Sequence, residues 1–207
     1  MVRALAALQT VLMPAESPRP AERAEPLSLA SSKLFSSRTV LLFGEVNTAL
    51  AESVCAQLLA HAAASSEPIR MLLHSPGGHV EAGDSIYDVI RYVTPRVRIL
   101  ASGWVASAGA LIYSAAELED RLALPNTRFM LHQPLGGVGG SASDVEIEAR
   151  QIMLMRERLN RTFARATAQT YERIVRDTDR NYWMSAEEAK AYGLVSRIIE
   201  HQGELDA

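Results

Sequence analysis

The chain has 207 residues, of which 48% are hydrophobic and 22% are charged, and its formal net charge at pH 7 is −3. This length fits one domain with extensions, and the composition is ordinary for a soluble globular protein. A slightly acidic balance offers no basic face to a nucleic acid, and no apolar run approaches the roughly 18 residues of a membrane span. These properties therefore argue against nucleic acid and membrane as partners.

The N-terminal segment carries weak folding signals. Residues 14–30 mix prolines with serine, alanine and glutamate, a composition typical of flexible segments. Residues 1–13 are mildly apolar but lack the cleavage site of a signal peptide. We expect residues 1–30 to be a leader or flexible segment and the main domain to occupy residues 31–207. The single cysteine, Cys55, forms no internal disulfide, so the chain is expected in the cytoplasm.

From about Arg38 onward, short apolar runs of strand length alternate with segments whose apolar residues recur at helical spacing. Continuous apolar strands that alternate with helices form parallel sheets covered by helices. The sequence therefore predicts an α/β fold, a layered, mostly parallel sheet covered by helices. Strands are expected at 39–43, 69–73, 97–101, 122–124, 129–131 and 194–199, and helices from Asn47 onward, over 82–93 and over 107–112.

A long helix is expected after Pro134. Residues 136–140 (Gly-Gly-Val-Gly-Gly) are too rich in glycine to be rigid. Ser143 and Glu146 then match a capping box, and apolar residues keep helical spacing as far as Ala166. So long a helix near the end of a small domain is expected to project and to pack against a partner. A second capping box and a C-terminal glycine mark a shorter helix at Ser185, Glu188 and Gly193.

Two segments that follow predicted strands carry candidate chemistry, because parallel α/β sheets bind ligands at the carboxyl ends of their strands. Residues 75–78 (Ser-Pro-Gly-Gly) follow one strand. Paired glycines can aim N–H groups at an oxyanion, although the same residues also suit a plain tight turn. Ser107 lies among small residues at a helix start and matches half of a nucleophile elbow, with Val105 in place of the first glycine. A helix N-cap is the alternative for this serine.

His132 is the candidate base. It ends an apolar strand, where a histidine can accept the proton of a serine at a neighbouring strand end. A core histidine bonded to the backbone is the alternative. His74 and His79 flank the Gly-Gly turn and are rival bases, whereas His61 and His201 lie in polar surroundings and are expected to be exposed.

These segments, in this order, closely resemble the proteolytic subunit of the ATP-dependent Clp protease, the ClpP family. The resemblance implies a crotonase-like fold and a serine endopeptidase that cleaves unfolded polypeptides to short peptides, with no metal and no cofactor of its own. It runs from about residue 38 to 199 and rests on residues 75–78, 86–88, 106–110, 124–126, 132–137, 176–180, 184–189 and 192–194.

The same resemblance implies an assembly. Two stacked seven-membered rings would enclose a chamber, built from this chain alone or mixed with a second ClpP-type subunit. The long helix would be a projecting handle, at about residues 133–167, that meets the opposite ring. An AAA+ unfoldase would thread the substrate in, and because the sequence has no Walker-type loop, ATP dependence would belong to that partner.

The resemblance also assigns the site. Ser107 would be the nucleophile, His132 the general base, and the backbone N–H groups of Gly78 and Ala108 the oxyanion hole. The third triad position, an aspartate in the family, is Asn181 here. Asparagine can orient the imidazole but brings no charge. In the Ser-His-Asp triad of serine proteases, replacing the aspartate by asparagine lowers turnover about ten-thousand-fold. We therefore expect low activity.

Two alternatives remain open from the sequence, and two more are disfavoured. The chain could be a weakly active or inactive structural subunit of a mixed ClpP barrel, or Asp179 could replace Asn181 as the partner of the base. A crotonase-type acyl-CoA enzyme would use paired backbone donors without a nucleophilic serine, but the segments around His132 and Asp177 disfavour it. A serine–lysine peptidase is disfavoured because the two lysines, Lys33 and Lys190, are not placed to serve Ser107.

Overall fold

A computed structural model describes residues 26–137 and 139–205. These residues form a layered α/β fold around a sheet of seven strands. The strands are β1 (Thr39–Phe43), β2 (Ile69–Ser75), β3 (Val97–Ala106), β4 (Arg121–Ala123), β5 (Arg128–Leu131), β6 (Tyr182–Ser185) and β7 (Arg197–Ile198). The helices are α1 (Pro26–Ser36), α2 (Thr48–Ala64), α3 (Val80–Tyr92), α4 (Ala108–Tyr113), α5 (Ala142–Thr167), α6 (Tyr171–Asp177) and α7 (Ala186–Tyr192), with short 3-10 turns at Leu118–Asp120 and Gln202–Glu204.

The sheet is parallel except at one edge. Strands β1, β2 and β3 pair in parallel, and β3 then pairs with two strands along its length. Its first half pairs with β4 around Ile99–Ala101, and its second half pairs with β5 around Trp104–Ala106. Strand β7 extends the β4 side in parallel, and β6 pairs with β5 in the antiparallel sense. The predicted fold class, a mostly parallel sheet with helices, is confirmed.

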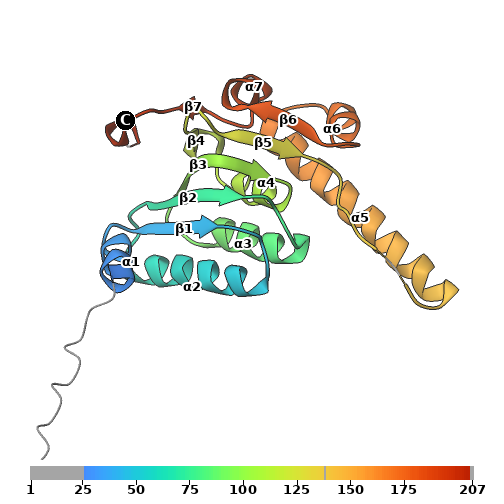
Figure 1. Ribbon diagram of the computed structural model, residues 1–207, viewed down its shortest axis with the longest axis horizontal. Helices are drawn as coiled ribbons and strands as arrows, with labels where there is room; N and C mark the ends of the chain where they lie inside the picture. Colours follow the sequence, from blue (N-terminus) through green and yellow to red (C-terminus); the bar gives the residue numbers. More distant parts are fainter. Residues whose placement is uncertain (1–25, 138, 206–207) are drawn as a thin grey trace, which may run out of the picture.

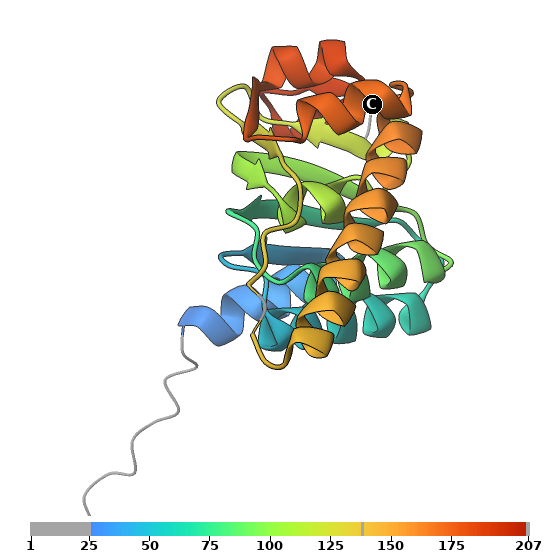
Figure 2. The same cartoon turned by 90° about the vertical axis from the view of Figure 1, so that its right-hand side faces the viewer.

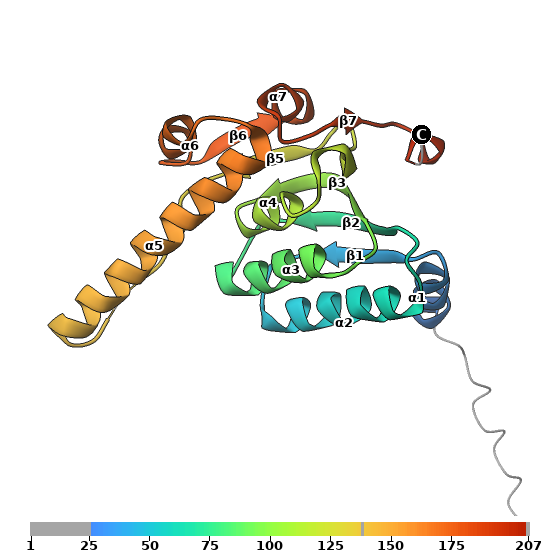
Figure 3. The ribbon, with the colours of Figure 1, turned by 180° about the vertical axis from the view of Figure 1, so that it is seen from behind.

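Helices α2, α3 and α4 lie on one side of the sheet, and α5 extends away from it (Figures 1 and 3). Figure 2 views the molecule from the side toward which α5 extends. The apolar stripes of α2 and α3 face the sheet, with Val54, Leu58, Ile86 and Ile90 buried. On the opposite sheet face, no helix among residues 26–137 and 139–205 covers β1, where Leu41 and Phe43 are exposed. Within the described ranges, no helix is both long enough and apolar enough to cross a bilayer.

The N-terminal boundary differs from the prediction. Helix α1 lies ahead of the first element expected from the sequence, the strand at 39–43, and was not predicted. Helix α1 packs onto the C-terminal end of α2, where the Phe35 ring stacks on His61 at 4.5 Å. The expectation that His61 is exposed is wrong, because its side chain is 1% exposed under this helix. This contact joins distant segments and therefore leaves no local periodicity in the sequence.

The predicted elements are otherwise close to the observed ones, with two further differences. The C-terminal strand covers only Arg197–Ile198 rather than 194–199, because Gly193 ends α7 in the left-handed conformation and the chain first has to turn back to the sheet. Strand β6, the antiparallel edge strand at Tyr182–Ser185, carries no long apolar run and was not predicted. The capping box of Ser185 and Glu188 is confirmed.

The capping box of the long helix lies two residues earlier than predicted. Ser141 is the N-cap of α5, and its Oγ accepts a hydrogen bond from the Asp144 backbone N–H at 3.2 Å. The Asp144 carboxylate in turn accepts one from the Ser141 N–H at 3.3 Å. The prediction of Ser143 and Glu146 is therefore wrong. Aspartate takes the place of the usual glutamate, and the helix begins at Ala142.

This assignment predicts an effect on helix stability for Ser141 and none for Ser143. Ser141→Ala removes the hydroxyl that accepts a hydrogen bond from the Asp144 backbone N–H. This should destabilise the first turn of α5 by about 1 kcal/mol. Amide hydrogen exchange over residues 142–146 should then accelerate about fivefold. Ser143→Ala is the matched control, because Ser143 does not cap the helix. In this variant, amide hydrogen exchange over residues 142–146 should match that of the parent. Equal acceleration in the two variants would contradict the assignment.

Candidate active site

Ser107 occupies a strained turn between a strand and a helix. Strand β3 ends at Ala106, and α4 begins at Ala108. Between them Ser107 has φ 55° and ψ −120°, a region that residues with side chains rarely adopt. Its backbone N–H donates to the Met130 carbonyl at 2.9 Å, which ties the turn to β5. This is the geometry of a nucleophile elbow, reached without the first glycine of the usual motif.

His132 and Asn181 are brought together by the antiparallel pairing of β5 and β6. Leu131 lies opposite Tyr182, so the next pair along the same register is His132 and Asn181. His132 Nδ1 lies 3.1 Å from Asn181 Oδ1, and His132 Nε2 lies 2.7 Å from Ser107 Oγ. If the Nδ1–H donates to the amide oxygen, the Nε2 lone pair is left to accept the serine hydroxyl proton.

The electrostatics of the site favour a neutral base. Partial burial of His132 lowers the pKa of its imidazole, and the hydrogen bond to Asn181 raises that pKa by a smaller amount. The net shift is downward, so the ring is neutral at pH 7 and able to accept a proton. No carboxylate compensates, because the Asp179 side chain pairs instead with Arg156 at 3.3 Å. Gln133 also donates to the Asp179 carbonyl at 2.7 Å, which holds this segment in place.

The loop that follows β2 lies directly against the serine. Gly77 and Gly78 have φ of +99° and +147°, a region that favours glycine. A Cβ on Gly77 would lie 2.6 Å from Ser107 Cβ, and one on Gly78 would lie 2.1 Å from the Val46 carbonyl oxygen. Neither position can accept a larger residue without movement. The structure thus brings the Gly-Gly turn, Ser107 and the first amide of α4, at Ala108, into one place.

The rival histidines make no hydrogen bond to Ser107 in the described part of the chain. His74 Nδ1 lies 3.2 Å from the Ser102 carbonyl, and its ring stacks on Phe43 at 5.5 Å. His79 is the N-cap residue of α3 and makes no side-chain capping bond. Only His132 among these candidates contacts Ser107 in the part of the chain that the structure describes.

A narrow apolar recess lies beside Ser107. Its volume is about 10 Å³, which is roughly the space of one water molecule. Leu159 and Phe163 of α5 form one wall. Both belong to the apolar stripe expected as far as Ala166, and neither was expected in the site. The other lining residues are Val80, Ala108, Leu111, His132 and Pro134.

Other reactive side chains do not join the site. Cys55 is half-buried on α2, and burial raises the pKa of its thiol, which keeps it protonated. Across residues 26–137 and 139–205, no three His, Cys, Asp or Glu side chains gather in a way that could hold a metal ion. The arrangement present is an alcohol, an imidazole and an amide in a row, which suits acyl transfer through a serine nucleophile.

Comparison with known proteins gives consistent matches over most of the chain. The Clp protease family model matches residues 22–202. ATP-dependent Clp protease proteolytic subunit 3 of Rhizobium etli is 59% identical over 174 residues, which cover 84% of this chain and 90% of the relative. Proteolytic subunit 2 of the ATP-dependent Clp protease of Gluconobacter oxydans is 57% identical over 182 residues, which cover 87% and 82%.

Solved structures agree with these matches. ClpP1 from Listeria monocytogenes is 52% identical, with a TM-score of 0.77, and the match covers 85% of this chain and 99% of that one. An asparagine-to-aspartate mutant of the same Listeria protein has a TM-score of 0.80 at the same identity and coverage.

The contact between the glycine turn and the serine can be tested directly. Gly77→Ala should displace Ser107, because the new Cβ would overlap the Ser107 Cβ. The rate at which a fluorophosphonate labels Ser107 should fall about 100-fold or more, since small displacements of a reacting group have effects of that size. Gly203→Ala is the control, because a Cβ at that position meets nothing within 4 Å. Unchanged labelling in Gly77→Ala would refute this account of the site.

Proposed function

Because the chain belongs to the Clp protease family and is a serine peptidase subunit of that family, we propose that Ser107 is its nucleophile and His132 its general base. The substrates would be unfolded polypeptides, cut to short peptides. The observation that carries this proposal is the 2.7 Å contact between Ser107 Oγ and His132 Nε2 at a strained turn.

The proposed reaction follows the geometry. Ser107 Oγ attacks the peptide carbonyl carbon and transfers its proton to His132 Nε2. The N–H groups of Gly78 and Ala108 receive the resulting oxyanion. The tetrahedral intermediate then expels the amine, which takes the proton from Nε2, and an acyl-serine remains. Water, deprotonated by His132, hydrolyses this ester and restores the serine.

Asn181 sets the expected level of activity. Its amide oxygen can fix the imidazole tautomer through the 3.1 Å contact. It brings no negative charge to stabilise the imidazolium that forms when the serine loses its proton. The pKa of His132 is lowered, because burial disfavours the charged ring by more than the hydrogen bond to Asn181 favours it. We therefore propose a peptidase with low intrinsic activity.

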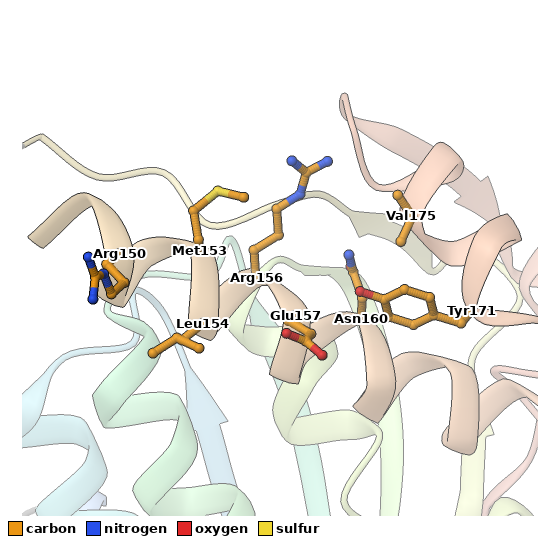
Figure 4. A pocket seen from close by; sticks show the side chains of 8 residues that line it. All are labelled: Arg150, Met153, Leu154, Arg156, Glu157, Asn160, Tyr171 and Val175. Carbon is orange, nitrogen blue, oxygen red and sulfur yellow. The ribbon is translucent and has the colours of Figure 1, made fainter. Parts of the chain in front are cut away.

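The proposal includes assembly into two stacked heptameric rings. The handle, about residues 133–167 of a peptidase domain at 31–207, would meet the opposite ring. Exposed apolar side chains on α5, at Ile147, Met153 and Leu154, support a partner on this helix. An open hollow of about 370 Å³ lies along the same helix, with Tyr171 and Val175 of α6 on its far side (Figure 4).

This hollow is larger than the recess beside Ser107, but it holds none of the proposed catalytic residues. Its open shape and its arginine side chains suit a protein contact better than a small substrate. We assign it to assembly rather than to catalysis. The remaining lining residues are Arg150, Met153, Leu154, Arg156, Glu157 and Asn160.

The proposed partners beyond the substrate are an AAA+ unfoldase and other ring subunits. The names of the Rhizobium and Gluconobacter relatives describe them as proteolytic subunits of an ATP-dependent protease. Because this sequence contains no Walker-type loop, the ATP-hydrolysing part would reside in another chain.

A second candidate function is a structural subunit of a mixed barrel that contributes little cleavage. The neutral third member, Asn181, favours it, because a serine triad loses most of its rate without the aspartate. The two candidates differ in whether the assembled chain cleaves peptides when no other ClpP-type subunit is present.

Two substitutions distinguish these candidates. In Ser107→Ala, cleavage of short fluorogenic peptides by the assembled chain should disappear, because no nucleophile remains. In Asn181→Asp, kcat should rise by up to about 10,000-fold, since the carboxylate stabilises the imidazolium. A parent without activity, beside an active Asn181→Asp, would favour the structural subunit. Cleavage that persists in Ser107→Ala would overturn the proposed nucleophile.

The pH profile supplies an independent check. The lowered pKa of His132 places the acidic limb of kcat/KM below the ordinary histidine value of about 6.5, because the base acts only when neutral. In Asn181→Asp a neighbouring carboxylate favours the charged ring, so the limb should move to higher pH by about 1 to 3 units. A limb that stays in place, or moves to lower pH, would mean that residue 181 does not face the base.

A further inference from the structure

Three side chains form a stack on the sheet face opposite the helices. The rings of Trp104 and Trp183 stack with centroids 6.0 Å apart and an interplanar angle of 16°. The Arg128 guanidinium carbon lies 4.6 Å from the Trp183 ring centroid, in a cation–π contact. We call Trp104, Arg128 and Trp183 the Trp–Arg–Trp cluster. The catalytic proposal gives it no role.

Each member of the cluster comes from one of the three strands that carry the proposed triad. Trp104 lies on β3, which leads to Ser107. Arg128 lies on β5, which leads to His132, and Trp183 lies on β6, which directly follows Asn181. The cluster therefore joins these strands through side chains, in addition to their backbone pairing.

The strand registers place the cluster beside the His132–Asn181 pair. Trp104 pairs with Arg128 across β3 and β5, and Trp183 pairs with Met130 across β5 and β6. Because side chains alternate between the two faces of a strand, Arg128 and Met130 share a face, and the cross-strand pair of Met130 and Trp183 lies on it. Met130 is 7% exposed. The next cross-strand pair along this face is the one formed by His132 and Asn181.

On this face, the other contacts among the described residues that hold β6 against β5 are the hydrogen bonds that Gln133 makes to the Thr178 and Asp179 carbonyls, just before Asn181. Strand β6 is a short edge strand that pairs only with β5 among the described strands. Asn181 lies just before its first residue and is exposed. Short edge strands are prone to fraying and slippage, whereas cross-strand aromatic and cation–π pairs oppose it.

We propose that the Trp–Arg–Trp cluster positions Asn181 against His132, so that Trp104 and Trp183 are positioning residues of the peptidase. The inference rests on the proposed function of Ser107 and His132. The cluster fixes β6 relative to β5, and this fixes the 3.1 Å contact of Asn181 Oδ1 with His132 Nδ1.

A neutral third member makes such positioning more important. An aspartate attracts an imidazolium over several ångströms, because charges interact at long range. An amide acts on the ring only through a directional hydrogen bond, which weakens steeply with distance and angle. In this chain, a small displacement of Asn181 therefore removes most of the stabilisation that its hydrogen bond gives to the His132 ring.

The test compares aromatic truncations on the same sheet face. In Trp183→Ala, fluorophosphonate labelling of Ser107 and kcat for a fluorogenic peptide should each fall about fivefold or more, with KM little changed. Trp183→Phe keeps an aromatic ring and should retain most of the activity. Phe43→Ala is the matched control, because it removes a stacked ring on β1, away from the triad, and should leave both rates unchanged.

A double-mutant cycle separates positioning from general destabilisation. If the cluster acts through Asn181, Trp183→Ala should have almost no further effect in an Asn181→Ala background. Trp183→Ala should also have a smaller effect in an Asn181→Asp background, because a carboxylate still attracts the imidazolium after a small displacement. The acidic limb of kcat/KM should move to lower pH in Trp183→Ala, because the hydrogen bond to Asn181, which raises the pKa of His132, is lost.

The outcomes are distinct from those of the proposed function. A reactive parent chain in which Trp183→Ala changes neither rate would overturn the positioning role alone. So would a fall of equal size in the parent and Asn181→Ala backgrounds. A parent in which Ser107 is inert to the fluorophosphonate would overturn the proposed function, and the positioning role with it.

Discussion

The site depends on the divided pairing of strand β3. Its first half pairs with β4 and its second half with β5, so the strand reaches beyond β4 and ends beside β5. The amide of Ser107 then bonds to the Met130 carbonyl and holds the serine in a conformation that an isolated residue avoids. His132 follows β5 directly, and β6 returns Asn181 to it. A uniform register between β3 and β4 would leave the serine without a base.

In the proposed triad the geometry is complete, while the charge is not. The two contacts of His132, at 2.7 Å and 3.1 Å, fix a tautomer and a direction for proton transfer. Burial disfavours the charged ring, and a neutral amide only partly opposes this. In the proposed reaction, the step with the least electrostatic support is therefore the formation of the imidazolium. The fold supplies the orientation of His132 in full but its electrostatic stabilisation only in part, so the two contributions can be studied separately.

Much of this could be predicted from local sequence. Apolar runs indicated most of the parallel strands, and the rule that ligands bind at strand ends singled out Ser107, His132 and the Gly-Gly turn. Helix α1 over His61 and the edge strand β6 were missed, because their stability comes from contacts between distant segments. Asn181 was found only through the family resemblance, since nothing in its local pattern points to a histidine. The capping box of α5 was predicted two residues too late, because its second member is Asp144 rather than the expected glutamate.

The composition of the sheet face also has an optical consequence. The chain contains 2 tryptophans, and both belong to the Trp–Arg–Trp cluster. Its intrinsic fluorescence therefore originates almost entirely at the strands that carry Ser107, His132 and Asn181. Emission intensity and wavelength report on the polarity and stacking of that one region, without an added label. Ring assembly or substrate entry that alters this face becomes visible in the native protein's own spectrum.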